Sequence, residues 1–153
     1  MKLHRRIIEA RYSGLKAGIV PFLADGRCLF MVSSDAMYGG SDPAIAKGQV
    51  DGEEDARAAA IREGEEELGL RKSNMAATPF LGWSGKLSGL NATYPIEVYA
   101  VLVKDEDNFS TPDRETARTV WLTRSEFTTK GRKSQAQIMA QIFDKIEAYL
   151  QNK

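Results

Sequence analysis

The sequence predicts an α/β domain in which helices pack against a β-sheet, and three observations lead to this class. Residues 15–23 and 28–32 are short apolar segments joined by a turn, as expected of two antiparallel strands. Residues 53–68 have a helix-forming composition and are followed directly by Gly69, a typical helix-ending residue. Residues 135–150 carry apolar side chains at helical spacing, which predicts an amphipathic helix on one face of the sheet.

The remaining elements fit the same class. Residues 80–85, 94–103 and 119–122 have the apolar alternation of strands, and Thr123 is suited to cap a following helical turn. Residues 33–51 are rich in Ser, Asp, Gly and Pro, which predicts a long loop. A long ordered loop in a small domain is usually functional. We therefore expect one α/β domain over residues 1–153.

Composition narrows the class of protein. The hydrophobic fraction of 42% and the charged fraction of 27% are typical of a globular chain and not of a disordered one. The single cysteine, Cys28, lies in an apolar segment, so we expect a buried thiol, no internal disulfide and a reducing compartment. No apolar segment reaches the ~18 residues of a membrane span. We expect a cytoplasmic protein that does not bind membranes.

Charge balance limits the partners. Lysine plus arginine and aspartate plus glutamate both number 21, so the net charge is zero. A neutral chain has no general positive field to hold a nucleic-acid backbone, so nucleic acid is not the expected partner. A polyanionic substrate would need a few well-placed cations or bound metal ions.

The helix predicted over residues 53–68 carries the most informative pattern. Glu63, Glu66 and Glu67 are three and four residues apart, so their carboxylates share one face of the helix. Glu54 lies near the helix start, and Arg62 precedes Glu66 by four residues and can orient it. Like charges at this spacing repel, and carboxylate oxygens are ligands that suit Mg²⁺ or Mn²⁺. The pattern therefore predicts a metal-binding face.

These residues carry a resemblance to a known family. The segment 48–70, GQVDGEEDARAAAIREGEEELGL, is similar to the Nudix box, GX5EX7REUXEEXGU, where U is a bulky aliphatic residue. The matching fixed positions are Gly48, Glu54, Arg62, Glu63, Glu66, Glu67 and Gly69. Gly64 departs from the pattern, because an aliphatic residue is usual there. The order of elements over roughly residues 15–150 resembles the Nudix α/β/α sandwich, with a mixed sheet between helices.

The resemblance implies an activity. A Nudix hydrolase cuts a phosphoanhydride bond in a nucleoside diphosphate derivative, of the ADP-ribose, FAD or dinucleoside polyphosphate type, by attack of water on phosphorus. By resemblance, Mg²⁺, with Mn²⁺ as a possible substitute, would be held by Glu54, Glu63, Glu66, Glu67 and the Gly48 carbonyl. The ions would neutralise the phosphates and lower the pKa of the attacking water. How many ions bind is left open.

Other site residues are predicted outside the helix. Many family members use a further acid before the last strand, and Glu115 is the candidate for this catalytic role, with Glu97 or a box glutamate as alternatives. Lys47 is a candidate contact for a phosphate. Aromatic side chains can stack on a nucleobase, and the candidates for this role are Tyr38, Trp83 and Tyr94.

Two other functions remain alternatives. A non-catalytic Nudix-like module that binds nucleotides or a partner protein would be expected to lack box carboxylates, which this chain keeps. An isopentenyl diphosphate isomerase shares the fold but would be expected to use a catalytic cysteine, and Cys28 is poorly placed for that role. We expect a small nucleotide as the substrate, with capped RNA ends left open. Whether the protein is a homodimer is also left open, although many relatives are.

Overall fold

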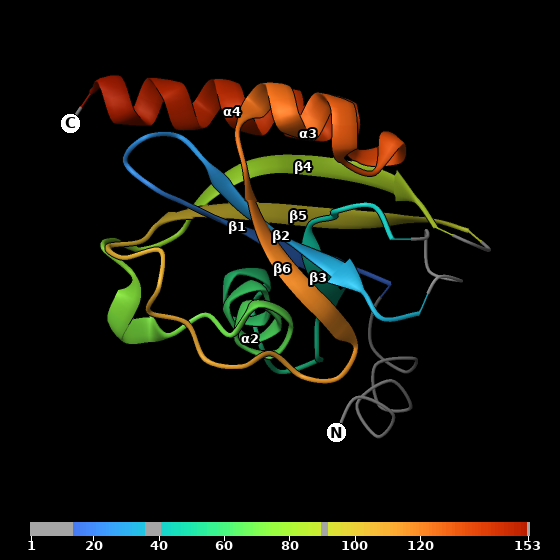
Figure 1. The fold of residues 1–153 in the computed structure, drawn as a ribbon. Helices are drawn as coiled ribbons and strands as arrows, with labels where there is room; N and C mark the ends of the chain where they lie inside the picture. Colours follow the sequence, from blue (N-terminus) through green and yellow to red (C-terminus); the bar gives the residue numbers. More distant parts are fainter. Residues whose placement is uncertain (1–13, 36–40, 90–91, 153) are drawn as a thin grey trace.

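The computed structural model describes residues 14–35, 41–89 and 92–152. Figure 1 shows a sheet between two layers of helix, with α4 (Ala136–Gln151) above it and α2 (Ala56–Leu68) below it. This arrangement confirms the predicted α/β class and the mixed sheet between helices.

The sheet contains six strands, and β1 lies at its centre. Their bounds are β1 Lys16–Phe22, β2 Cys28–Ser33, β3 Ala46–Gln49, β4 Phe80–Ser88, β5 Thr93–Leu102 and β6 Thr116–Leu122. Five of them follow the order β4-β5-β1-β2-β6, and β3 pairs with β1. The β1–β5 pair is parallel and the others are antiparallel, so the sheet is mixed.

Short helical segments complete the two outer layers. The short helix α3 (Arg124–Lys130) packs beside α4, and single 3-10 turns occur at η1 (Lys72–Asn74) and η2 (Lys133–Gln135). Thr123 caps α3 as predicted, since its side chain accepts a hydrogen bond from the Glu126 N–H. None of the helices described here has both the length and the hydrophobicity needed to cross a membrane.

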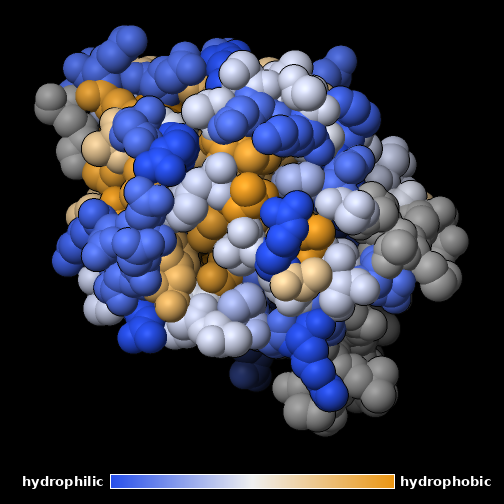
Figure 2. Space-filling model, viewed as in Figure 1, coloured by the Kyte–Doolittle hydropathy of each residue, from blue (hydrophilic) through white to orange (hydrophobic). Residues whose placement is uncertain are grey.

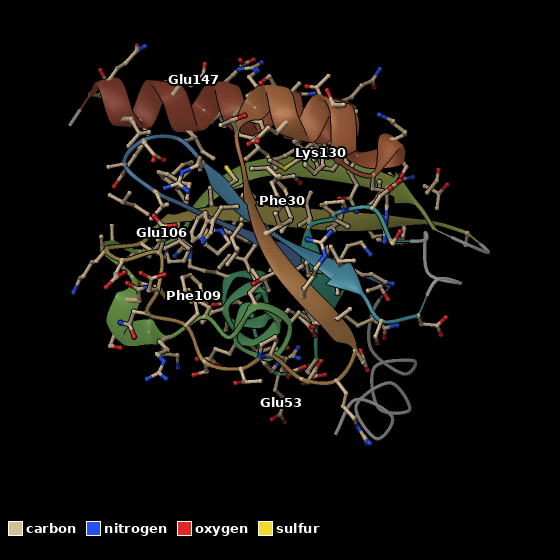
Figure 3. All side chains as sticks on the ribbon, in the orientation of Figure 1. Phe30, Glu53, Glu106, Phe109, Lys130 and Glu147 are labelled. Atoms are coloured by element: carbon tan, nitrogen blue, oxygen red, sulfur yellow. The ribbon has the colours of Figure 1, made fainter. Side chains whose placement is uncertain are left out.

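Each face of the sheet has its own hydrophobic core. Alternate residues of β1 point to opposite faces, so Ala17 and Ile19 pack toward α2, whereas Val20 and Phe22 pack toward α4. Figure 3 shows Phe30 between the sheet and the upper helices, where its ring centroid lies 4.4 Å from that of Phe127. In Figure 2 hydrophobic atoms are visible mainly in the middle of this view, between hydrophilic atoms above and below. The helices therefore turn their polar sides to solvent.

The prediction of a loop over residues 33–51 is wrong near the end of this segment, because Ala46–Gln49 forms strand β3. This segment has no β-branched or aromatic residue that would indicate a strand. It becomes one by pairing with β1, with Gly18 opposite Lys47 and Ala17 opposite Gly48. Tertiary pairing has overridden the local composition.

The helix predicted to begin at residue 53 begins at Ala56 instead. Asp55 is its N-cap, and the Asp55 side chain accepts a 2.7 Å hydrogen bond from the Ala58 N–H. Glu54 therefore belongs to the preceding turn, and Figure 3 shows Glu53 pointing away from the protein below α2. At the other end Gly69 adopts a left-handed conformation with φ of 72°, as predicted for the end of the helix.

Candidate active site

The helix α2 packs against the outer edge of β3, the edge that does not pair with β1. There the Lys47 backbone N–H donates a 3.0 Å hydrogen bond to Glu67 Oε1. The Gln49 carbonyl accepts a 3.0 Å hydrogen bond from Arg62 Nη2. Side chains of the helix thus satisfy backbone groups that a neighbouring strand would otherwise bind. The carboxylates of Glu63, Glu66 and Glu67, here called the acidic stripe, therefore face the edge of β3, and only Glu66 of the three is also partly exposed to solvent.

Burial separates the glutamates of the helix. Glu63 is 0% exposed and Glu67 is 6% exposed, whereas Glu66 is half-buried and Glu65 is exposed. The Glu63 carboxylate fits because residue 48 is glycine: a Cβ there would overlap this carboxylate. The first glycine of the box therefore makes room for one of its glutamates.

Arg62 joins the carboxylates at the centre of this site. Its Nη1 lies 2.8 Å from Glu63 Oε2 and 3.4 Å from Glu66 Oε2. Its Nε lies 3.2 Å from Glu54 Oε2, and its Nη2 binds the other oxygen of Glu54. Burial alone would lower the pKa of the Arg62 guanidinium, but the hydrogen bond that it donates to Glu54 and the charge of Glu63 hold this pKa above its ordinary value. The predicted orienting role of Arg62 extends to three carboxylates.

The site carries surplus negative charge. Its carboxylates belong to Glu54, Glu63, Glu66 and Glu67. The four negative charges of these glutamates against the one positive charge of Arg62 leave a formal charge of −3, before the carboxylate of Asp51 is counted. In the described part of the chain no three His, Cys, Asp or Glu side chains are grouped ready for a metal ion, because the carboxylates are divided between Arg62 and the β3 backbone.

Asp51 is a residue of this site that the sequence pattern missed. Its Oδ2 lies 4.0 Å from Arg62 Nη2, and its Oδ1 is buried without a hydrogen-bond partner. The Asp51 N–H donates to Glu54 Oε1 at 3.0 Å, which holds the two acids in one turn. Asp51 occupies a variable position of the box pattern, so the pattern contains no signal for it.

Gly64 is explained by close packing under the sheet. A Cβ at this position would lie 2.8 Å from Ile19 Cγ2 and 3.1 Å from Leu70 Cδ2. Ile19 is fully buried in β1 and has little room to move. The departure from the box pattern therefore concerns packing of α2 against the sheet, and not the carboxylates.

The loop that carries Glu115 is held against the C-terminal end of α2. Thr116 Oγ1 donates to the Glu67 carbonyl and the Asp113 N–H donates to the Glu66 carbonyl, both at 2.8 Å. Glu115 itself is exposed, and its carbonyl accepts a 3.0 Å hydrogen bond from the Ser34 N–H. Glu115 therefore lies between Asp113 and Thr116, the two residues that attach this loop to the backbone of Glu66 and Glu67.

Glu97, the alternative candidate for the further acid, lies on β5, on the far side of β1 from β3. Residue 17 of β1 pairs with Glu97 of β5 on one side and with Gly48 of β3 on the other, so two strand spacings separate Glu97 from Gly48. The Glu97 carboxylate accepts a 2.7 Å hydrogen bond from the Tyr99 hydroxyl. Burial and this hydrogen bond raise the pKa of Tyr99 to about 12.

The other predicted residues lie away from the acidic stripe. The Lys47 side chain points to the face opposite α2, where its Nζ lies 5.8 Å from the centroid of the Tyr94 ring. Trp83 of β4 packs against the core beneath α4. Tyr38 is outside the described residues. Cys28 is fully buried, as predicted, and burial raises the pKa of its thiol.

An acidic helix that packs on the strand edge of a mixed α/β/α sandwich is the arrangement found in Nudix hydrolases. The family model of the NUDIX domain matches residues 13–142, and the chain belongs to this family. It is a Nudix pyrophosphohydrolase, an enzyme class that hydrolyses pyrophosphate bonds in nucleotides and generally uses divalent metal ions. No curated protein sequence matches the chain.

Solved structures share the fold at low sequence identity. A C. elegans Ap4A hydrolase binary complex has a TM-score of 0.73 at 19% identity, over 91% of this chain and 98% of that chain. The NUDIX domain of Shewanella oneidensis NrtR complexed with ADP ribose has a TM-score of 0.66 at 12% identity, over 86% and 87%. The Nudix hydrolase RenU from M. smegmatis has a TM-score of 0.64 at 18% identity, over 89% and 88%.

Proposed function

We propose that the protein hydrolyses a phosphoanhydride bond in a small nucleoside diphosphate derivative, and that it requires divalent cations held by the acidic stripe of α2. The observation that carries the proposal is the collection of four box carboxylates at one edge of β3, where Arg62 contacts those of Glu54, Glu63 and Glu66 and the Lys47 N–H binds that of Glu67. Nucleotide phosphates are anionic, so they need compensating positive charge at this acidic edge.

The donor set suits a divalent cation. Its oxygens are hard ligands, the four glutamates and Arg62 together carry a formal charge of −3, and Asp51 adds a buried acceptor, Oδ1, without a donor. Glu63, Glu66 and Glu67 are the proposed carboxylate ligands, with Glu54 beside them. When bound, Mg²⁺ or Mn²⁺ supplies charge neutralisation, polarises the scissile bond and lowers the pKa of the attacking water.

The backbone of β3 supplies a further oxygen. The N–H and C=O of one residue in a strand point to the same edge. The Lys47 N–H points to Glu67 and the Val50 N–H to the Leu15 carbonyl on the β1 side. By this alternation the Lys47 carbonyl faces the acidic stripe, whereas the predicted ligand, the Gly48 carbonyl, faces β1. We therefore propose Lys47 as the backbone ligand.

Proton transfer falls to an acid near the end of the stripe. Glu66 is half-buried, so solvent can reach its carboxylate. The hydrogen bond that Arg62 Nη1 donates to Glu66 Oε2 orients this carboxylate. Glu115 lies in the loop that binds the carbonyls of Glu66 and Glu67, which supports its predicted role as the further acid. A carboxylate in either position can accept the proton of the attacking water.

Two structural neighbours support the proposed substrate class. One is titled as an Ap4A hydrolase and another as a NUDIX domain complexed with ADP ribose. Both compounds are nucleoside diphosphate derivatives of the classes we propose here, and they set the composition of the test panel.

The experiment is a screen of the purified protein for metal-dependent phosphoanhydride cleavage. The panel contains ADP-ribose, FAD, diadenosine polyphosphates, nucleoside triphosphates and sugar nucleotides, each with Mg²⁺, Mn²⁺ or EDTA. We expect turnover of one class that EDTA abolishes, with ¹⁸O from labelled water found in a phosphate product. A folded protein that binds nucleotides but cleaves none of them would instead be a binding module.

A further inference from the structure

Strand β6 contains a bulge among its first residues, next to the C-terminal end of α2. Val32 of β2 pairs with Arg118 of β6. Ser33, the next residue of β2, pairs with Thr116. Ala117 is therefore the extra residue of a bulge in β6. A bulge interrupts the alternation of side chains along a strand, and bulges beside active sites re-aim a side chain in this way.

The bulge determines the direction of the Thr116 side chain. In the regular part of β6, Val120 and Leu122 pack in the core on the α4 side, whereas Trp121 packs on the α2 side. Unbroken alternation would turn Thr116 toward α4 as well. Because of the extra residue, Thr116 points to α2 instead, and its hydroxyl donates a 2.8 Å hydrogen bond to the Glu67 carbonyl. Thr116 is 8% exposed, so water does not replace this contact.

This hydrogen bond satisfies a carbonyl at the end of the helix. The last carbonyls of a helix have no partner within the helix and need donors from elsewhere. The loop before β6 passes the end of α2 (Figure 1) and supplies such donors. The Ser110 N–H donates to the Gly69 carbonyl at 2.7 Å, and the Asp113 N–H donates to the Glu66 carbonyl at 2.8 Å. These two donors belong to the backbone, whereas that of Thr116 belongs to a side chain and can be removed by substitution.

The turn that ends in Thr116 also holds the backbone of Glu115. The Thr116 N–H donates a 3.1 Å hydrogen bond to the Asp113 carbonyl, and the Glu115 N–H donates one of 3.1 Å to Asp113 Oδ1. From β2, the Ser34 N–H donates to the Glu115 carbonyl at 3.0 Å, and the Ser34 hydroxyl donates to the Arg114 carbonyl at 2.8 Å. The Glu115 backbone is thus fixed between β2 and α2, while its side chain is exposed.

We infer that Thr116 is a positioning residue for the reaction, and that the bulge in β6 serves to turn its hydroxyl toward α2. Through the Glu67 carbonyl, Thr116 fixes the backbone of Glu115 relative to the carboxylates of Glu66 and Glu67. The inference rests on the proposed function, because it takes Glu115 as the carboxylate that accepts the proton of the attacking water. The placement of such a base affects the rate of the chemical step more than the affinity for substrate. Thr116 therefore acts on kcat through Glu115.

The first test measures the attachment of the turn without turnover. Thr116→Val removes the hydroxyl and keeps the branched shape, whereas Thr116→Ser keeps the hydroxyl. Amide hydrogen exchange is followed at Ser34 and Asp113, whose N–H groups bind the carbonyls of Glu115 and Glu66. We expect exchange at both amides to be about tenfold faster in Thr116→Val, as loss of one hydrogen bond gives, and close to wild type in Thr116→Ser. Unchanged exchange in Thr116→Val, or equal acceleration throughout the core strand β5, would overturn the inference.

Thr128→Val is the matched control. Thr128 is exposed in α3, and its hydroxyl also donates to a helix carbonyl, that of Arg124, at 3.1 Å. This variant makes the same chemical change beside α4 and should leave turnover and the exchange of Ser34 and Asp113 unchanged. Equal effects of Thr128→Val and Thr116→Val would show that the position of the hydroxyl is unimportant, and this result would overturn the inference.

The second test measures turnover of the best substrate at saturating metal. Thr116→Val should lower kcat about tenfold while KM stays within about twofold, and Thr116→Ser should restore most of kcat. In the Glu115→Gln background, Thr116→Val should change kcat by less than about twofold, because the residue that it positions is already inactive. Effects of the two substitutions that multiply would show that Thr116 does not act through Glu115. This result would overturn the inference and leave the proposed hydrolysis standing.

Failure of the proposed function has a different signature. A wild-type protein that cleaves no substrate would contradict both the hydrolysis and the catalytic role of Thr116, even with faster exchange in Thr116→Val. Turnover by the wild type with an unchanged kcat in Thr116→Val would contradict the role of Thr116 alone. Turnover by the wild type, a lower kcat in Thr116→Val and recovery in Thr116→Ser are the combination that we expect.

Discussion

The backbone of Gly48 lies directly against the carboxylate of Glu63, so closely that a Cβ at residue 48 would overlap it. This contact joins strand β3 to helix α2 at a point where the glutamate is fully buried. Residue 48 must therefore be glycine because the carboxylate of Glu63, fifteen residues later in the sequence, occupies the space that a side chain would fill. The same contact holds the carboxylate in the layer between strand and helix, where Arg62 reaches it.

Replacing Gly48 with alanine should displace Glu63 and weaken both folding and activity. Overpacking of this kind costs about 2 kcal/mol of unfolding free energy, and kcat/KM should fall because the carboxylate moves from its place beside Arg62. Urea unfolding and steady-state kinetics give the two quantities. Gly14→Ala is the control, since a Cβ at Gly14 has nothing within 4 Å. Equal stability and activity in the two variants would show that the contact is unimportant.

Arg62→Gln should destabilise the fold and reduce turnover, because Glu54, Glu63 and Glu66 then lose their shared cation. Hydrogen bonds to charged groups contribute roughly 2 kcal/mol each, so we expect a loss of at least that size for this partly buried group. Arg62→Lys keeps the charge without the fork of donors and should recover only part of the loss. Urea unfolding measures the change, and the exposed Arg71, as Arg71→Gln, is the control. Wild-type stability in Arg62→Gln would contradict the central role of the guanidinium.

Glu115 and Glu97 should respond differently to neutralisation. Loss of a general base lowers turnover by roughly a hundredfold or more, which we expect for Glu115→Gln at saturating substrate and metal. Glu97 is bound to Tyr99 and lies two strands from Gly48, so Glu97→Gln should keep kcat within about threefold. The reverse order would assign the further acid to Glu97. Small effects in both would assign the role to a box glutamate.

Tyr99 should make the fold sensitive to alkaline pH. Its pKa is raised from 10.0 to about 12, so the unfolded chain releases this proton before the folded protein does. The stabilisation is fully present below pH 10 and is lost as pH rises from 10 toward 12. Unfolding free energies measured by urea at several pH values should converge between wild type and Tyr99→Phe across this range. A constant difference between them would show that Tyr99 is not the responsible group.

Spacing in the sequence was sufficient to predict the acidic face of the helix. Glu63, Glu66 and Glu67 lie on one face because residues three and four apart share a face of any helix. Gly69 ends the helix with a left-handed backbone conformation. This helix end could be predicted because glycine is the residue that adopts that conformation most readily. The helix face and the helix end each depend on a few neighbouring residues, so both could be predicted from the sequence.

The rest of the site depends on contacts between distant segments. Strand β3 has no strand-like composition and forms because β1 pairs with it. Burial of Glu63 follows from that pairing, since β3 covers the helix face that spacing alone leaves open to solvent. Lys16 and Tyr94 are 78 residues apart in the sequence and meet only in the folded sheet, where the Lys16 Nζ lies 4.2 Å from the centroid of the Tyr94 ring. No local pattern contains these relationships.

The most direct test of the account compares Glu67→Gln with Glu65→Gln. Glu67 is 6% exposed and bound to the β3 backbone, whereas Glu65 is an exposed glutamate of the same helix two residues earlier. The measurement is kcat/KM with Mg²⁺ on the best substrate, together with the Mn²⁺ affinity from electron paramagnetic resonance. We predict that Glu67→Gln lowers kcat/KM by roughly a thousandfold and weakens Mn²⁺ binding, as loss of a metal ligand in a catalytic site does, while Glu65→Gln changes neither. Equal activity in the two variants would contradict the assignment of the acidic stripe as the metal-binding catalytic centre.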